Sequence, residues 1–163
     1  MPATVEAELI ARLASYDKNM KARAGGRINI VIAVKQGDPG SERAAAQLVA
    51  AFGRLEHVAG LPHETRTVVF AGSAAFVAAC KDKRAAIVII TDALAPEVEA
   101  LRAGFEGVNV LTVGGSAEMS RRGLVVGVEL VSSRPRLFIN LTQAGKQSVA
   151  MSADVLKLMT VYR

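Results

Sequence analysis

Apolar residues fall into two kinds of pattern along the chain, continuous runs and spaced repeats. Residues 28–34 and 85–91 are almost continuously apolar and rich in β-branched side chains. Such runs are typical of strands covered on both faces, as in a parallel sheet. Residues 65–70 and 108–113 have shorter runs of the same kind. The pattern therefore predicts four buried strands in the first two thirds of the chain.

The segments around these strands predict helices over residues 5–24, 41–60, 73–81 and 96–103. In the first two, apolar side chains recur every three or four positions, which gives each helix one apolar face. Ser41 is predicted to cap the second helix. Strands alternating with helices predict right-handed βαβ crossovers, hence a three-layer α/β/α sandwich with a mainly parallel sheet.

The alternation stops after the fourth strand. Residues 124–131 and 136–141 predict two short strands, and their short connector implies an antiparallel hairpin at one edge of the sheet. Residues 142–163 predict a C-terminal helix. No linker, repeat or low-complexity tract interrupts the chain, so residues 1–163 are expected to form a single α/β domain.

Composition excludes several classes of protein. With 51% hydrophobic and 21% charged residues, the chain is too apolar to be disordered. No apolar run approaches the roughly 18 residues that a membrane span needs. The net charge of +5 comes from scattered lysines and arginines, and aromatic residues make up only 4%. Nucleic-acid binding surfaces interleave basic and stacking aromatic side chains, so no nucleic-acid partner is expected.

Residues that commonly carry chemistry are scarce. Cys80 is the only cysteine and lies in an apolar helical segment, which favours a buried, inert thiol. His57 and His63 flank a turn without the further ligands that a metal site requires. No nucleophile elbow of the G-x-S-x-G type is present. The sequence therefore predicts no catalytic residues, no metal site and no cofactor, and we expect a protein that is not an enzyme.

A ligand crevice is predicted where parallel strands end, because open parallel sheets bind ligands beyond the carboxyl ends of their strands. Glycines and small polar residues dominate this position. The candidate crevice residues are Gly37, Asp38, Thr91, Asp92, Gly114, Gly115 and Ser116. The backbone amides of Gly114, Gly115 and Ser116 favour a small anionic ligand. A tight turn followed by a serine helix cap explains these three residues equally well. A small-ligand sensor or solute-binding domain is thus one hypothesis.

Asp92 directly follows a buried strand, the position of the phosphorylated aspartate in receiver-like cytoplasmic modules. That chemistry needs Mg²⁺ and therefore further carboxylates nearby. Lys35 and Gln36 occupy the positions where receiver-like folds carry a pair of acids. A turn or capping role explains Asp92 better, and the receiver hypothesis is the weakest of the three.

Several motifs in the last third occur in an order that resembles the YfiR-like family of bacterial domains. They are VLTVGGS at residues 110–116, Arg122-Gly123, LVVGVEL at 124–130, RLFINL at 136–141 and SADVLKL at 152–158. Family members commonly have two glycines where this chain has Arg122-Gly123. Asn140 and Ser152 match family positions, and both are expected to cap turns or helices.

The resemblance implies an exported, periplasmic α/β domain without catalytic activity. The best-known members of the family repress a membrane-bound diguanylate cyclase through a periplasmic partner domain, which lowers cyclic-di-GMP and biofilm formation. The resemblance therefore implies a role that depends on protein–protein contact. The implied partner is therefore a membrane-bound signalling protein. A homodimer is a further possible assembly. Residues 1–13 do not have the pattern of a signal peptide, so the periplasmic location rests on the resemblance, with the cytoplasm as the alternative. A lone Cys80 excludes an intramolecular redox disulfide.

Overall fold

A seven-stranded sheet forms the centre of the computed structural model, which describes residues 1–163. The strands are β1 (Ile28–Lys35), β2 (His63–Phe70), β3 (Ile87–Ile90), β4 (Leu111–Gly114), β5 (Val126–Val131), β6 (Arg134–Asn140) and β7 (Thr160–Tyr162). Their order across the sheet is β2-β1-β3-β4-β5-β6-β7. The first five are parallel, β6 runs antiparallel to β5, and β7 runs parallel to β6.

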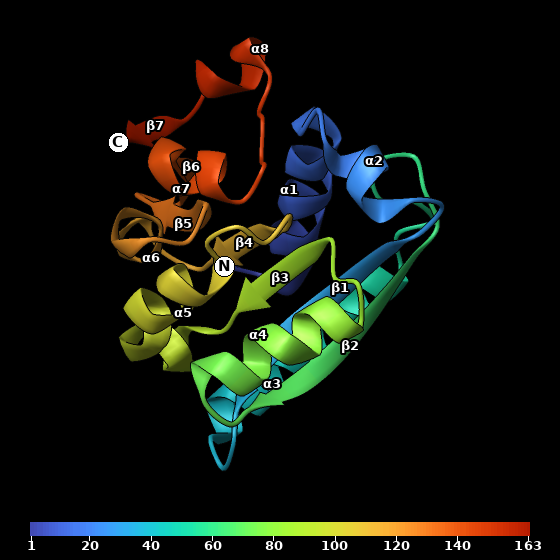
Figure 1. Cartoon of the computed structure of the whole chain (residues 1–163), viewed down its shortest axis with the longest axis vertical. Helices are drawn as coiled ribbons and strands as arrows, with labels where there is room; N and C mark the ends of the chain where they lie inside the picture. Colours follow the sequence, from blue (N-terminus) through green and yellow to red (C-terminus); the bar gives the residue numbers. More distant parts are fainter.

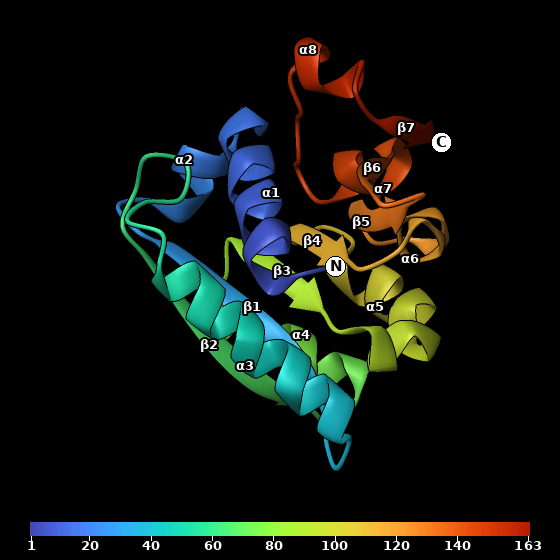
Figure 2. The same ribbon diagram turned by 180° about the vertical axis from the view of Figure 1, so that it is seen from behind.

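Helices cover both faces of the sheet. They are α1 (Ala3–Tyr16), α2 (Met20–Ala24), α3 (Pro39–Gly53), α4 (Ser73–Asp82), the 3-10 helix η1 (Asp92–Glu97), α5 (Val98–Phe105), α6 (Ala117–Arg122), α7 (Leu141–Lys146) and α8 (Ala153–Leu156). Figure 1 is seen from the side of α4 and α5, and Figure 2 from the side of α1 and α3. Alternate residues of β1 enter the two cores: Ile30 and Ile32 face one, Val31 and Ala33 the other. The predicted three-layer α/β fold is confirmed.

The first helix is shorter than predicted. Residues 5–24 were expected to be helical throughout, but α1 ends at Tyr16, Asp17 forms a β-bridge with Met151, and α2 begins at Met20. The break places the Asp17 carboxylate 2.7 Å from the Arg23 guanidinium, and both side chains are almost fully buried. A continuous helix could not bring these two groups together with the chain around Met151.

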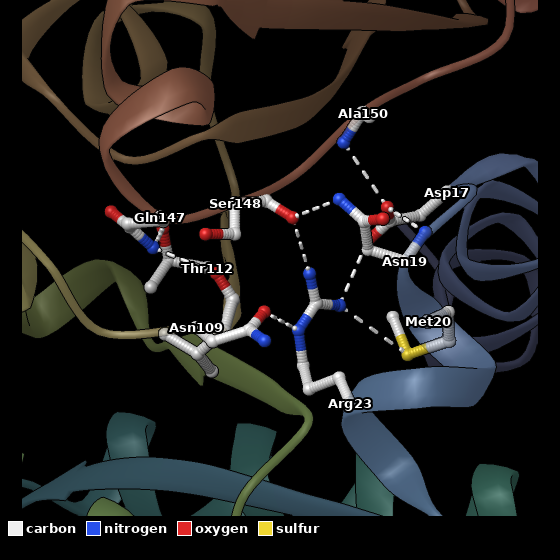
Figure 3. A network of polar contacts seen from close by, with 10 residues as sticks. Asp17, Asn19, Met20, Arg23, Asn109, Thr112, Gln147, Ser148 and Ala150 are labelled. Carbon is white, nitrogen blue, oxygen red and sulfur yellow. Dashed lines mark hydrogen bonds and ion pairs between the residues drawn. The ribbon is translucent and has the colours of Figure 1, made fainter.

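The Asp17–Arg23 pair is the centre of a polar network that ties three distant segments together (Figure 3). Arg23 donates through Nε to Asn109 Oδ1 at 2.6 Å and through Nη2 to the Ser148 carbonyl at 3.0 Å. Asp17 Oδ1 accepts from the backbone N–H of Ala150 at 3.1 Å. The network thus holds the α1–α2 junction against the segment before β4 and the segment after α7.

The C-terminal region is not the single helix predicted for residues 142–163. It divides into α7, α8 and the three-residue strand β7. The fully buried Gln147 ends α7, because its side-chain amide donates to the Val110 carbonyl at 2.9 Å, and Ser148 then adopts a positive φ of 57°. Strand β7 pairs with β6, where Tyr162 stacks on Phe138. The predicted hairpin therefore lies inside the sheet, and β7 forms the edge.

The boundaries of two further helices also differ from those predicted. Helix α3 ends at Gly53, because residues 54–62 form a loop that contains the bridge between Val58 and Leu61. Its cap is Asp38, whose carboxylate accepts from the backbone N–H of Ser41 at 2.9 Å, so the predicted cap at Ser41 is wrong. The chain around Pro96 is a 3-10 helix that precedes α5.

Candidate functional site

A cleft of about 560 Å³ opens at the carboxyl ends of β1 and β3. The amino terminus of α1, the first turns of α3 and the outer end of β5 complete its walls. Figures 1 and 2 both show the amino terminus of the chain beside the end of β3. Met1, Leu48, Ile90, Val128 and Leu130 contribute its apolar lining. The cleft thus lies at the position where parallel sheets bind ligands.

The structure brings together four of the seven candidate crevice residues. Asp38, Thr91, Asp92 and Gly115 line the cleft. Gly115 lies so close to the Asp92 carboxylate that a Cβ atom would clash with Oδ1. A side chain at position 115 would therefore displace the exposed Asp92 carboxylate from the rim of the cleft.

The other three candidates lie outside the lining and have structural roles. Gly37 is exposed in the turn after β1, where φ is +73°. Gly114 is buried in β4, where a Cβ atom would approach Met119 Cβ to 2.9 Å. Ser116 caps α6 by accepting from the Met119 N–H at 3.2 Å, as predicted.

Two hydroxyl groups at the floor of the cleft are committed to the fold. Thr91 Oγ1 donates to the Ala33 carbonyl at 2.7 Å, so Ser41 Oγ is the donor in its 2.8 Å contact with Thr91. Ser41 Oγ also accepts from the Lys35 N–H at 2.9 Å. These bonds join the ends of β1 and β3 to α3, and they leave neither hydroxyl proton for a ligand.

The charged side chains of the cleft are all acidic. Glu6, Asp38, Asp92 and Glu129 line it, and no lysine, arginine or histidine does. Glu129 accepts from the backbone N–H of Ala117 at 2.8 Å. Glu6 and Glu129 were not among the candidates, because they come from α1 and the hairpin rather than from the ends of the first strands. This lining favours a cationic group and disfavours the predicted small anionic ligand.

Glu6 has an altered pKa. Burial raises the pKa of the Glu6 carboxyl to about 7, the negative charge of Asp92 adds to the rise, and the amino terminus opposes it. The carboxyl is therefore partly protonated at neutral pH. It can therefore take up or release a proton near neutral pH.

Glu6→Gln is expected to stabilise the protein at pH 8 but not at pH 4. The raised pKa means that the folded chain binds more protons than the unfolded chain between pH 4.5 and about 7. Stability therefore falls as the pH rises through this window, and the loss persists above it. We expect a gain of about 1–3 kcal/mol at pH 8 from the substitution. Urea unfolding at the two pH values measures it.

Glu8→Gln serves as the control for this measurement, because Glu8 is exposed on the same helix. The control is expected to have the same small effect at both pH values. Equal effects of Glu6→Gln at pH 4 and pH 8 would show that burial does not perturb this carboxyl.

The remaining chemical residues do not form a site. Cys80 is buried in α4, as predicted, and burial raises the pKa of its thiol to about 12, which keeps it protonated and unreactive. His63 is half-buried, and its Nε2 lies 2.7 Å from the Leu55 carbonyl oxygen. No three His, Cys, Asp or Glu side chains gather closely enough to hold a metal ion. None of the helices has the length and apolarity of a membrane-spanning segment.

Comparison with known families identifies the chain. The sequence profile described as YfiR/HmsC-like matches residues 3–160, nearly the whole chain. The chain belongs to the YfiR/HmsC-like family. The expected resemblance, drawn mainly from the motifs after Val110, is thereby confirmed. No curated protein matches this member of the YfiR/HmsC-like family.

Solved structures share the fold of this YfiR/HmsC-like chain at low sequence identity. A conserved domain protein from Vibrio cholerae superposes with a TM-score of 0.72 at 14% identity, over 99% of this chain and 60% of that one. A Streptococcus pneumonia ABC domain in complex with L-Trp superposes with a TM-score of 0.71 at 15% sequence identity. The match covers 99% of this chain and 62% of that one. A substrate-binding protein with adhesive properties from Clostridium difficile superposes with a TM-score of 0.64 at 6% sequence identity. The match covers 90% of this chain and 58% of that one. The chain spans about three fifths of the length of each.

Proposed function

We propose that residues 1–163 form a single periplasmic regulatory domain that represses a membrane-bound diguanylate cyclase by protein–protein contact. Membership of the YfiR/HmsC-like family carries this proposal, since the match extends over residues 3–160. The side chains agree with a role in binding: the buried thiol is unreactive, and no cluster of metal-ligating residues exists. In this proposal the domain represses by binding to the cyclase or to its periplasmic partner domain, and repression does not require a catalysed reaction.

Co-expression with the cognate membrane cyclase tests this proposal. Cells that export the chain to the periplasm are expected to contain less cyclic-di-GMP and to form less biofilm than cells with an empty vector. The same chain retained in the cytoplasm is the matched control and is expected to have no effect. Unchanged cyclic-di-GMP at verified periplasmic expression would contradict the proposal.

A second candidate function is the binding of a small cationic ligand in the cleft. Its volume of about 560 Å³ and its lining by four carboxylates and several aliphatic side chains favour a compact molecule with an ammonium group and an apolar part. The fold is shared with a domain solved in complex with L-Trp and with a substrate-binding protein, which supports ligand binding as a use of this fold. In those longer proteins a further segment is present beyond the part that this chain matches.

Thermal unfolding in the presence of amino acids, amines and small anions tests the second candidate. A ligand that binds only the folded state raises the melting temperature, and the shift grows with the ratio of its concentration to its Kd. We expect shifts with amines or amino acids, none with anions, and smaller shifts in Asp92→Asn. A response to anions alone would contradict the assignment of charge to the cleft.

A further inference from the structure

The end of the molecule farthest from the acidic cleft carries the most exposed large apolar side chain of the chain. Leu158 is 77% exposed and lies in the turn between α8 and β7. In both figures α8 and the carboxyl end of α1 lie at this end, and the chain's amino terminus, beside the cleft, lies away from it (Figures 1 and 2). Tyr16, the last residue of α1, is 40% exposed, and its carbonyl accepts from the Ser152 N–H at 3.0 Å, directly before α8.

The fold holds Leu158 outside the core. Its neighbours Val155 and Met159 are buried in the core between α1 and the sheet. The Leu158 N–H donates to the Val155 carbonyl at 2.9 Å, and the Met159 N–H donates to the Leu156 carbonyl at 3.2 Å. Leu158 is therefore exposed on a hydrogen-bonded turn that two buried side chains anchor. A single exposed apolar side chain needs no explanation by itself, so the charges around it decide what it can contact.

The basic side chains near Leu158 have no acidic partners in the chain. Lys18 lies beside the segment that enters α8, because its N–H donates to the Ala150 carbonyl at 2.9 Å. Residues 16–24, 54–62 and 153–158 contribute four exposed cations that form no ion pair: Lys18, Lys21, Arg54 and Lys157. The exposed carboxylates of the same segments are Glu56 and Asp154. Cations thus predominate here, whereas the charged lining of the cleft is entirely acidic. An anionic surface attracts this end of the molecule and repels the cleft.

We propose that this end, formed by Tyr16, Lys18, Lys21, Lys157 and Leu158, binds the surface of a bilayer that contains anionic phospholipids. Leu158 enters the boundary between headgroups and acyl chains, and the Tyr16 ring lies at the level of the headgroups. The three lysines then lie beside lipid phosphates.

The exposed leucine favours a lipid surface over other anionic partners. A polyanion such as a nucleic acid offers no apolar layer to an aliphatic side chain. A projecting side chain also enters a fluid surface without the matching cavity that a protein partner has to supply. The proposal goes beyond the regulatory role and does not depend on it. Binding through this end directs the acidic cleft away from the bilayer.

Flotation with lipid vesicles tests the proposal, with circular dichroism to show that each variant is folded. The wild type is expected to float with vesicles of phosphatidylcholine and phosphatidylglycerol in equal amounts, and not with phosphatidylcholine alone. Salt is expected to release it, because exposed charges are screened. Leu158→Asp is expected to weaken partitioning by about 10-fold, since the inserted apolar side chain is lost. Lys18→Glu is expected to weaken it by about 10- to 30-fold, because an attraction becomes a repulsion.

Val69→Asp and Lys35→Glu are the matched controls. Val69 is 54% exposed on β2, and Lys35 is exposed at the carboxyl end of β1. Both variants are expected to float almost as the wild type does. A polarity-sensitive fluorophore provides a second readout: attached to Leu158→Cys it is expected to shift to shorter wavelengths on anionic vesicles, and attached to Val69→Cys it is not. The buried Cys80 stays unlabelled.

A wild-type chain that does not float with anionic vesicles would overturn the proposal and leave a protein as the partner of this end. Controls that weaken flotation as much as Leu158→Asp and Lys18→Glu would also overturn it, as would a fluorophore shift at position 69 alone. The vesicles contain no cyclase, so failure here is distinct from failure of cyclase repression.

Discussion

Arg23→Ala is expected to lower the free energy of unfolding by about 3–5 kcal/mol, because it leaves the buried Asp17 carboxylate without its counter-ion. The side chains of Asp17 and Arg23 are 0% and 3% exposed, and their 2.7 Å contact is therefore removed from water. The substitution also removes hydrogen bonds to Asn109 and to the Ser148 carbonyl. Urea unfolding of the wild type and the variant measures the difference.

Arg27→Ala is the matched control, because Arg27 forms an exposed pair with Glu64 at 3.5 Å. Exposed pairs contribute about 0–1 kcal/mol, so the control is expected to unfold almost as the wild type does. The double variant Asp17→Asn with Arg23→Met is expected to lose less stability than the sum of the single changes, since neither partner is left charged and alone. Similar losses in Arg23→Ala and Arg27→Ala would contradict the role assigned to the network.

Gln147→Leu is expected to cost about 2–4 kcal/mol, since buried polar groups left without partners cost about 1–3 kcal/mol each. Gln147 is fully buried. Its amide donates to the Val110 carbonyl, and its carbonyl oxygen accepts from Gln143 Nε2 at 2.8 Å. Limited proteolysis provides the local readout, because the loss of these bonds frees the chain after α7 before the sheet unfolds.

Gln36→Leu is the control for this change, because Gln36 is exposed in the turn after β1. We expect it to leave both stability and the proteolysis pattern unchanged. If Gln147→Leu also leaves cleavage after α7 unchanged, the Gln147 bonds do not hold the C-terminal segment in place.

The predictable part of the fold is the part that local patterns determine. Continuous apolar runs such as residues 28–34 became central strands, because only a strand covered by helices on both faces buries every side chain. Cys80 was correctly placed in the core because the helical segment around it is apolar. The antiparallel pairing of β5 and β6 followed from their short connector. Their place at the edge of the sheet was wrong, because β7 pairs with β6 from far along the chain.

The two wrong helix predictions share one physical cause. No local signal stops the first helix at Asp17. In the last segment the one local signal of a break is Ser152, which caps α8, whereas nothing near Gln147 ends α7 there. Each is ended by bonds to a segment far along the chain: Asp17 to Ala150, and Gln147 to Val110. Such partners are invisible in a window of neighbouring residues. A buried aspartate or glutamine on an apolar helical face is the one available signal.

The candidate site was predictable in position but not in charge. Strand ends and their glycines located the crevice, and Asp38 and Asp92 indeed line it. Its acidic character depends equally on Glu6 and Glu129, which reach the cleft from the first helix and the hairpin. Their contribution follows from the packing of α1 and β5 across the ends of the parallel strands, and no motif in the sequence indicates it.

Intracellular cyclic-di-GMP, measured with the chain exported to the periplasm beside its cognate membrane cyclase, tests the regulatory role most directly. Repression by contact predicts a fall in cyclic-di-GMP on export, together with recovery of the cyclase or its periplasmic partner when the chain is captured from detergent-treated membranes. Cyclic-di-GMP that is the same with and without the exported chain, with no signalling protein captured, would contradict the role.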